Sequence, residues 1–241
     1  MTESMAPSAP RTARERVRTE LSSEIKEIAL TQLADGGASA LSLRGIAREM
    51  GMASSALFRY FRSRDALLTA LIIDGYSALA DAAETAEAAV HTGSVEDRWR
   101  AICHGVRGWA VTHPEQYTLI FGSPIPGYAA PQDTIGPASR VPLLLGALLA
   151  DLMASGGYDP TDHPEPSVAI QRALEPVRTT VPPEIPADLL VRGLMAWTYL
   201  FGAVSFELFG HRHNVIGDYA AFFDHEVGRV AVLLGLTDPR S

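Results

Sequence analysis

Apolar residues recur at steps of three and four along nearly the whole chain, which is the spacing of amphipathic helices. The first such pattern ends at the sequence DGG of residues 35–37, because paired glycines stop a helix. Its apolar face comprises Val17, Leu21, Ile25, Ile28, Ala29 and Leu33. No alternating pattern of the strand type extends over more than a few residues. The sequence therefore predicts an all-α protein.

Serine residues mark the starts of two further helices. Ser42 is a suitable N-cap for a short helix that runs to about Met50, and Ser63 is suitable for a long helix from Arg64 to about Ala89. A second short helix is expected over 53–61. The later patterns predict helices at about 95–112, 114–122, 138–155, 165–175, 187–210 and 218–235.

The two short helices are separated by Gly51, which can adopt the positive φ that larger residues resist. Ala47 is small enough to let the helices approach each other closely. Such a pair forms a helix-turn-helix, whose second helix can enter a DNA major groove. The same geometry occurs in proteins that never bind DNA, so the pattern alone also allows a solvent-exposed three-helix corner.

Charge distinguishes this segment from the rest of the chain. The net charge is −8, yet residues 1–65 hold 10 Arg and Lys against 8 Asp and Glu, whereas residues 66–241 hold 10 against 20. Residues 1–15 lack apolar periodicity and predict a flexible basic arm. Hydroxyl, guanidinium and aromatic groups can contact phosphates and base edges. The candidates for DNA contact are Ser42, Arg44, Ser54, Ser55, Phe58, Arg59, Tyr60 and Arg64.

Composition narrows the functional classes. Cys103 is the only cysteine, which excludes an intramolecular disulfide and a cysteine-based zinc site. His211, His213 and His225 form only a weak metal pattern, so we expect neither a metal nor a cofactor. We find no nucleophile elbow, phosphate loop or paired carboxylates, which argues against an enzyme. We find no apolar leader and no run of about twenty residues free of charges and helix breakers. We therefore expect a cytoplasmic protein with no membrane partner.

The segment SLRGIAREMGMASSALFRYFRSRDALL, residues 42–68, resembles the DNA-binding domain of the TetR family of bacterial transcription regulators. The matching positions are Ser42, Ile46-Ala47, Gly51-Met52-Ala53, Leu57 to Phe61, Ser63-Arg64 and Leu67-Leu68. Three positions depart from the family pattern. Ala53 replaces a Ser or Thr cap, Phe58 replaces a Tyr whose hydroxyl often reaches DNA, and Arg64 replaces a Lys with its charge retained.

The resemblance implies an arm over 1–15, a three-helix DNA-binding domain over 16–65, and a larger helical ligand-binding and dimerisation domain over 66–241. The segments WAVTHPEQYTLIFGSPIPGY (109–128) and MAWTYLFGAVSFELFGH (195–211) resemble the WHG-like ligand-binding domain of actinobacterial members. This likeness implies a pocket for an apolar small molecule, although each aromatic residue taken singly is more typical of the core. The candidate ligand-binding residues are Trp109, His113, Tyr117, Phe121, Trp197 and Phe201.

The helix expected over 187–210 is apolar nearly all round, so one face calls for a partner unless the helix is buried in a monomer. Together with the last helix it would form the four-helix interface of a homodimer, as the resemblance implies. A two-fold dimer places two recognition helices about 34–36 Å apart, which predicts a pseudo-palindromic operator. The candidate dimer contacts are Ala196, Gly202, Ala203, Phe222, Val230 and Leu233.

These observations favour a DNA-binding transcriptional regulator. We expect a repressor that an apolar effector releases from its double-stranded operator, with the helix that starts near Arg64 transmitting the signal. Two alternatives stay open at this point. One is a dimeric helical adaptor that binds protein through its N-terminal unit, and the other is an enzyme that uses the ligand pocket.

Overall fold

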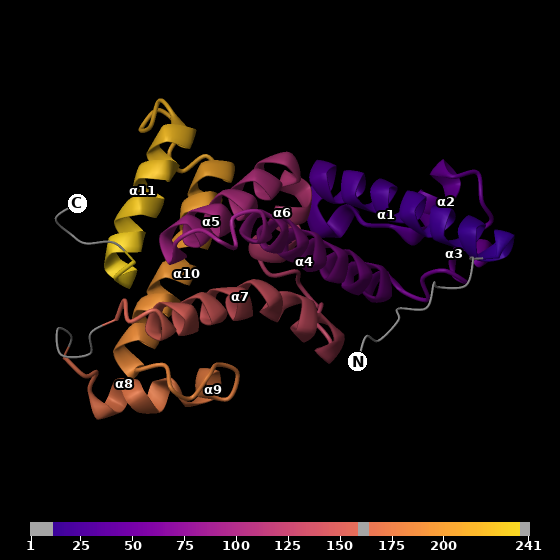
Figure 1. The fold of residues 1–241 in the computed structure, drawn as a ribbon. Helices are drawn as coiled ribbons and strands as arrows, with labels where there is room; N and C mark the ends of the chain where they lie inside the picture. The colour runs from indigo at the N-terminus through magenta and orange to yellow at the C-terminus, as the bar shows by residue number, and fades with distance from the viewer. Residues whose placement is uncertain (1–11, 159–163, 237–241) are drawn as a thin grey trace. The chain divides into compact units, whose positions relative to one another are not determined.

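The computed structural model describes residues 12–158 and 164–236, and this part of the chain contains helices and no strand. Figure 1 shows the helices in chain order. The chain divides into two compact units. Residues 1–71 and 124–129 make up the first unit, and residues 72–123 and 130–241 make up the second. Helix α4, Arg64–Ala88, begins in the first unit and continues in the second.

The first unit is built from α1 (Ala13–Ala40), α2 (Leu43–Glu49), α3 (Ser54–Leu57) and the start of α4. Its apolar side chains meet in a small core, as the sequence pattern predicts. The residues buried in this core include Ile25, Ala29, Ile46, Ala47, Leu57, Phe61, Leu67 and Leu68.

Both predicted serine caps are present. The Ser42 hydroxyl accepts a hydrogen bond of 3.1 Å from the backbone N–H of Gly45, and the Ser42 N–H donates to the Gln32 side chain at 3.0 Å. The Ser63 hydroxyl accepts from the N–H of Ala66 at 3.0 Å. These bonds satisfy N–H groups that have no partner within their helices. Gln32 also ties the start of α2 to α1.

Two helices of the first unit, α1 and α3, differ from the prediction in part. Helix α1 begins at Ala13, inside the segment expected to be an arm, and residues 1–11 lie outside the described part. Its assignment runs on to Ala40, but Gly36 and Gly37 have non-helical backbone, so regular helix ends at the glycine pair as predicted. Helix α3 has four residues rather than the nine expected. The chain continues as turns, with the Tyr60 N–H bonded to the Leu57 carbonyl at 2.8 Å.

The second unit contains the rest of α4 and seven further α-helices within the described residues. The α-helices are α5 (Val95–Thr112), α6 (Pro114–Phe121), α7 (Ile135–Ala154), α8 (Val168–Ala173), α9 (Glu175–Arg178), α10 (Ala187–Leu208) and α11 (Tyr219–Leu234), and a 3-10 turn, η1 (Gln132–Thr134), precedes α7. The helix expected over 165–175 is the shorter α8, and α9 lies mostly in the segment after it, where no helix was expected. The others agree with the prediction to within three residues at each end.

Helix α5 is central to the second unit and contacts α6, α7, α10 and α11. Trp99 is 1% exposed, and its indole N–H donates to the Val227 carbonyl of α11 at 2.9 Å. Gly105 lets α4 and α5 approach closely, because a Cβ at this position would lie 2.9 Å from the Ala82 carbonyl oxygen. The buried helix is therefore fixed by both an apolar face and a specific hydrogen bond.

Two bidentate ion pairs hold segments of the second unit together, and Arg212 of the second pair lies in the turn after α10. Arg107 of α5 contacts Glu207 of α10 at 2.6 and 2.8 Å. Arg212 contacts Glu226 of α11 at 2.7 and 2.9 Å. All four side chains are less than a fifth exposed. Burial of these charges is tolerated because each guanidinium faces both oxygens of its carboxylate.

Three helical stretches, α4, Gln132–Ala154 and α10, are long and apolar enough to cross a membrane by length and composition alone. Each stretch contains charged residues and helix breakers, such as Asp74 in α4, Arg140 in the second stretch and Arg192 in α10. In the second unit these stretches contribute buried residues to the core, among them Leu79, Leu148 and Leu200.

Candidate DNA-binding and effector sites

The turn between α2 and α3 fixes the geometry of the candidate DNA-binding surface. Gly51 adopts φ = +64°, the positive value that the sequence predicts. The Gly51 N–H bonds to the Arg48 carbonyl at 3.2 Å, and the Met52 N–H bonds to the Ala47 carbonyl at 2.8 Å. These bonds close the end of α2. Leu57, which is fully buried, anchors α3 in the core of the unit.

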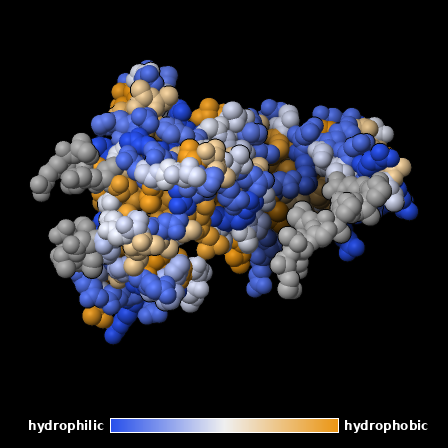
Figure 2. Space-filling view, viewed as in Figure 1, coloured by the Kyte–Doolittle hydropathy of each residue, from blue (hydrophilic) through white to orange (hydrophobic). Residues whose placement is uncertain are grey.

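The residues around α3 that face solvent are those the sequence singles out. Ser54, Ser55, Phe58 and Arg59 are exposed, and Tyr60 is half-buried. Phe58 keeps 41% of its surface exposed although it is aromatic. The face of the first unit visible in Figure 2 is largely hydrophilic. Residues 54–60, which are α3 and the turn after it, therefore present hydroxyls, a cation and aromatic edges together.

The other candidates lie at helix starts. Arg44 is exposed in the first turn of α2, and Arg64 is half-buried at the start of α4, 3.7 Å from Asp65. The Ser42 hydroxyl already serves as the N-cap of α2, so its first role is structural. Arg48, which the sequence analysis did not single out, is also exposed on α2. Its spacing of four from Arg44 places the two arginines on one helix face.

A separate, apolar cavity of about 140 Å³ lies within the second unit. Its walls come from α4, α6, α7 and α10. None of its lining residues carries a formal charge at neutral pH. The lining residues are Tyr76, Leu79, Phe121, Pro137, Ala138, Val141, Pro142, Trp197 and Phe201.

Aromatic rings form much of the cavity wall. The rings of Phe121 and Phe201 stack with their centroids 4.4 Å apart, and Trp197 meets Phe201 edge-on at 6.2 Å. Tyr76 contacts Phe121 edge-on at 5.8 Å, and its hydroxyl donates to the Ile120 carbonyl at 3.2 Å. The cavity thus contains three of the six predicted ligand-binding residues, Phe121, Trp197 and Phe201.

Tyr117 supports this wall from behind rather than lining it. The residue is fully buried, and its hydroxyl donates to the Phe201 carbonyl at 3.0 Å and shares a hydrogen bond of 2.9 Å with Ser205. Burial raises the pKa of the Tyr117 phenol to about 12, partly opposed by the Ser205 hydrogen bond. Its ring centroid lies 4.9 Å from that of Phe121.

Two predicted ligand-binding residues lie away from the cavity. Trp109 is packed in the core and is 7% exposed, while His113 is exposed and stacks on Trp109 with centroids 5.3 Å apart. The four-residue spacing misled the prediction, because the chain leaves α5 at His113 and starts α6 at Pro114. Residues before and after this break do not share one helix face. The spacing also gave no sign of Tyr76 and Leu79 on α4 or of the α7 residues in the wall.

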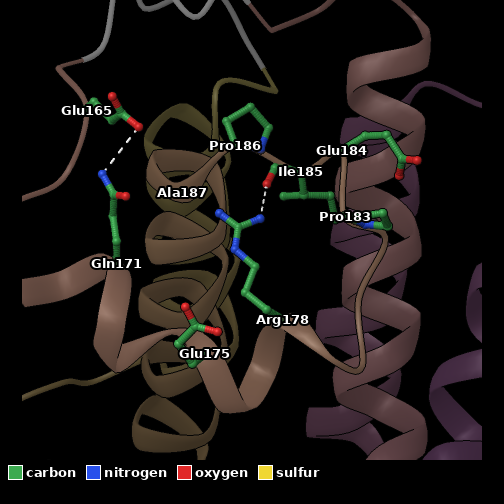
Figure 3. A pocket seen from close by; sticks show the side chains of 9 residues that line it. All are labelled: Glu165, Gln171, Glu175, Arg178, Pro183, Glu184, Ile185, Pro186 and Ala187. Atoms are coloured by element: carbon green, nitrogen blue, oxygen red, sulfur yellow. Dashed lines mark hydrogen bonds between the residues drawn. The ribbon is translucent and has the colours of Figure 1, made fainter. Parts of the chain in front are cut away.

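A larger hollow of about 480 Å³ lies beside α8 and α9 (Figure 3). Three exposed carboxylates line it, those of Glu165, Glu175 and Glu184. Arg178 extends across the hollow and donates to the Ile185 carbonyl. These polar walls offer little to an apolar ligand, so the smaller cavity is the better candidate for an effector site.

Comparison with known proteins decides between the functional classes. Residues 25–71 match the model for bacterial regulatory proteins of the tetR family, and residues 99–230 match the tetracyclin repressor-like C-terminal domain. The HTH-type transcriptional regulator Rv1816 of Mycobacterium tuberculosis is 38% identical over 221 residues, which cover 90% of this chain and 93% of the relative. The chain belongs to the TetR family. It is a DNA-binding transcriptional regulator and not an enzyme.

Solved structures agree with this assignment. The regulatory protein SCO4313 is 36% identical and superposes with a TM-score of 0.74, covering 92% of this chain and 98% of the other. A tetR-family regulator from Rhodococcus RHA1 shares the fold at 14% identity and a TM-score of 0.64, covering 90% and 98% of the two chains. TetR-family regulators bind DNA operators and act as dimers, and soluble members are typically cytoplasmic.

Three of the predicted dimer contacts are unsuitable in this TetR-family protein. Ala196, Ala203 and Val230 are buried within their own protomer, at 6% exposure or less, because the small side chains face neighbouring helices. The other three, Gly202, Phe222 and Leu233, are half-buried or exposed. Spacing alone did not distinguish the inner from the outer face of a helix that is apolar all round.

An apolar stripe on α10 remains open to solvent. Met195 and Phe206 are each 52% exposed, and Tyr199 is 38% exposed. Gly202 lies between them in sequence, with open space where a Cβ would point. We call Met195, Tyr199, Gly202 and Phe206 the α10 stripe. Steps of four, three and four place its members on one helix face.

The described residues contain no group of three or more His, Cys, Asp or Glu side chains that could hold a metal ion. Cys103 is fully buried on α5, and burial raises the pKa of its thiol well above the ordinary value. A buried neutral thiol is a poor ligand and a poor nucleophile. Cys103 therefore acts as part of the core.

Proposed function

We propose that this TetR-family protein is a repressor that an apolar small molecule releases from a pseudo-palindromic operator. The observation that carries the proposal is the helix pair α2–α3, in which a capped first helix and a glycine turn hold an exposed polar and aromatic face. The apolar cavity in the second unit supports the effector role. It combines aromatic walls with the absence of formal charge among its nine lining residues.

The DNA contacts proposed are those around α3 together with the arginines at neighbouring helix starts. Arg59 and Tyr60 project from the chain directly after α3, while Arg44 and Arg64 occupy first turns of their helices. Guanidinium groups bind phosphates or the edges of guanine. Phe58 lacks a hydroxyl, so its contact would be apolar, as with a thymine methyl group.

The α10 stripe is the proposed centre of the dimer interface. Exposed large apolar side chains on one helix face favour burial against a copy of themselves, because removing apolar area from water is favourable. Gly202 offers open space in which a partner helix can approach closely. Phe222 and Leu233 of α11 complete the set. A two-fold pair would present the two recognition units to successive major grooves.

Helix α4 is the proposed route from the effector to DNA. It starts at Arg64 beside the DNA-binding residues and carries Tyr76 and Leu79 of the cavity wall about three to four turns later. An effector that prefers one α4 position over another by about 1–3 kcal/mol changes operator affinity by about 5–150-fold. The effector must prefer the conformation whose recognition helices do not match the operator.

A gel-shift titration tests this function. The purified full chain is mixed with DNA from upstream of its own gene and with an excess of unrelated competitor DNA. We expect a shifted complex that survives the competitor and weakens steeply as salt is raised, because phosphate contacts release counterions. Equal affinity for the upstream and the competitor DNA would overturn the proposal of a specific operator at this locus.

A further inference from the structure

The chemistry of the cavity wall restricts what can enter it. Seven of the nine lining residues have side chains of carbon and hydrogen only, and the other two, Tyr76 and Trp197, are uncharged. Burial raises the pKa of the Tyr76 phenol, which keeps it protonated at neutral pH. An anion or cation inside this wall would lose its hydration without gaining an opposite charge.

The arginine nearest in sequence to the lining residues cannot supply the positive charge that a bound anion would need. Arg140 lies between the lining residues Ala138 and Val141 on α7, but its guanidinium is bound to Glu84 at 2.6 and 3.0 Å and to Asp81 at 2.6 Å. Both acids lie on α4, so these bonds also join α7 to α4. A ligand carboxylate would have to displace two existing carboxylates to reach Arg140.

The volume sets the size of the ligand. An apolar protein cavity of about 150 Å³ can hold a single benzene ring. The cavity of about 140 Å³ is close to that size. Flat walls formed by Phe121, Phe201 and Trp197 favour a flat ring, which can stack or meet them edge-on. A long flexible chain exceeds this volume.

We infer that the effector is a small uncharged aromatic molecule of a single ring, bound in the cavity that Phe121, Phe201 and Trp197 line. This inference rests on the proposed function, in which the cavity is the effector site. It restricts the class of ligand further than apolar character alone does, because it excludes aromatic acids, protonated aromatic amines and long acyl chains.

Isothermal titration calorimetry of the full chain with three probes tests the ligand class. The probes are 4-methylphenol, 4-methylbenzoate and decan-1-ol, which represent a neutral ring, a charged ring and a flexible chain. We expect 4-methylphenol to bind at least about tenfold more tightly than either of the others, since the wall penalises charge and excess volume. Comparable binding of the benzoate or the alcohol, or no binding of 4-methylphenol, would overturn the inference.

Three variants establish where the probe binds. Ala138→Leu fills part of the cavity from α7 and should weaken 4-methylphenol binding by about tenfold or more. Ala154→Leu makes the same change at an exposed position of the same helix and should leave binding unchanged. Thermal unfolding confirms that both alanine-to-leucine variants are folded. Trp197→Phe keeps a neutral aromatic wall and should bind 4-methylphenol within a fewfold of the affinity of the natural chain. Unchanged binding by Ala138→Leu places the ring elsewhere and overturns the inference.

The experiments distinguish a failure of this inference from a failure of the proposed function. Operator binding is measured first without any probe, so a failure of specific DNA binding appears there alone. If 4-methylphenol binds the cavity but leaves the operator complex intact at saturation, the proposed release mechanism is wrong while the size and charge preference of the cavity stands. If the operator is bound and no neutral ring enters the cavity, the ligand class is wrong while DNA binding stands.

Discussion

At the scale of single residues, side chains that cap or anchor a helix were easier to predict than those that line a cavity. Ser42 and Ser63 cap their helices through hydrogen bonds to residues three positions ahead, a local geometry that spacing can indicate. Tyr76 lines the cavity only because α6 and α7 pack beside α4, which no local pattern records. Trp109 and Phe121 belong to the same pattern of aromatic residues at steps of four, but Trp109 lies in the core and Phe121 lines the cavity.

Arg59 provides a direct residue-scale prediction. Arg59→Ala should weaken operator binding by at least about tenfold, because loss of one specific contact costs about 1–3 kcal/mol at each half-site. The dependence of affinity on salt should also become shallower if the contact is to phosphate. Fluorescence anisotropy with labelled operator measures both effects. Arg172→Ala, an exposed arginine of α8, is the matched control and should behave as the natural chain does.

Tyr117 makes a pH-dependent contribution to stability. Its pKa of about 12 lies above the ordinary value of 10.0, so the unfolded chain loses this proton first as pH rises. The contribution is complete below pH 10 and is lost as pH rises toward 12, because the free energy of unfolding then falls by up to about 1.4 kcal/mol for each rise of one in pH. Tyr117→Phe should cost about 1 kcal/mol at neutral pH, with a smaller deficit at alkaline pH.

Denaturant unfolding at neutral and alkaline pH measures this deficit, and ultraviolet titration of tyrosine gives an independent check. Burial and the neighbouring Glu226 also raise the pKa of Tyr199 to about 12. Tyr117 and Tyr199 should therefore be among the last of the seven tyrosines to titrate. A deficit that stays constant with pH, together with titration of all seven near pH 10, would contradict a stabilising role for the buried Tyr117 phenol.

At the scale of elements, helices with clear start and stop signals were predicted well. Helix α5 begins after Ser94, which forms a capping box with Asp97, and ends before Pro114, so its bounds agree with the expected 95–112. Helix α3 is shorter than predicted because Ala53 provides no capping side chain and the following serines compete for backbone hydrogen bonds. Pro176 indicates that the helix before it ends near Leu174, but it gives no sign that the short helix α9 starts there.

The segment Pro124–Ala129 is a second candidate element for signal transmission. It belongs to the first unit although it lies between two parts of the second, and Tyr128 shares a hydrogen bond of 2.9 Å with Thr69 of α4. Phe121 precedes the segment by three residues, and Pro137 follows it, and both line the cavity. We propose that this segment connects the cavity wall, along the chain, to the hydrogen bond between Tyr128 and Thr69.

Tyr128→Phe should weaken the response to effector while leaving the affinities for operator and for effector nearly unchanged. The ratio of operator affinities with and without effector should fall by about 2- to 10-fold, which is the effect of one net hydrogen bond of about 0.5–1.5 kcal/mol. Thr69→Val should give the same loss, and the double variant should add nothing further. Additive losses in the double variant would show that the two hydroxyls act separately.

At the scale of the whole molecule, dimerisation determines whether two recognition units can act together. The sequence indicated that α10 needs a partner, but the burial of Ala196 and Ala203 within the protomer shifts the proposed contact to the α10 stripe. Only the packed fold distinguishes the two faces of such a helix, because both are apolar.

Phe206→Arg should separate the dimer. A charge placed in the α10 stripe would be desolvated against its own symmetry copy, so the dissociation constant of the dimer should rise by about 100-fold or more. Sedimentation velocity over a range of concentrations measures this change. Leu143→Arg on α7 is the control, since Leu143 is also a large exposed apolar residue, at 46%, outside the stripe. Equal dimer stability in both variants would exclude the α10 stripe as the interface.

Selection of bound sequences from a random DNA library by the full chain tests whether a two-fold dimer reads DNA through the α2–α3 units. We predict an enriched inverted repeat whose half-sites are separated by about one helical turn or a multiple of it. We also predict that the enrichment disappears with Arg59→Ala. Recovery of no enriched sequence, or of a single unrepeated site unaffected by Arg59→Ala, would contradict the claim.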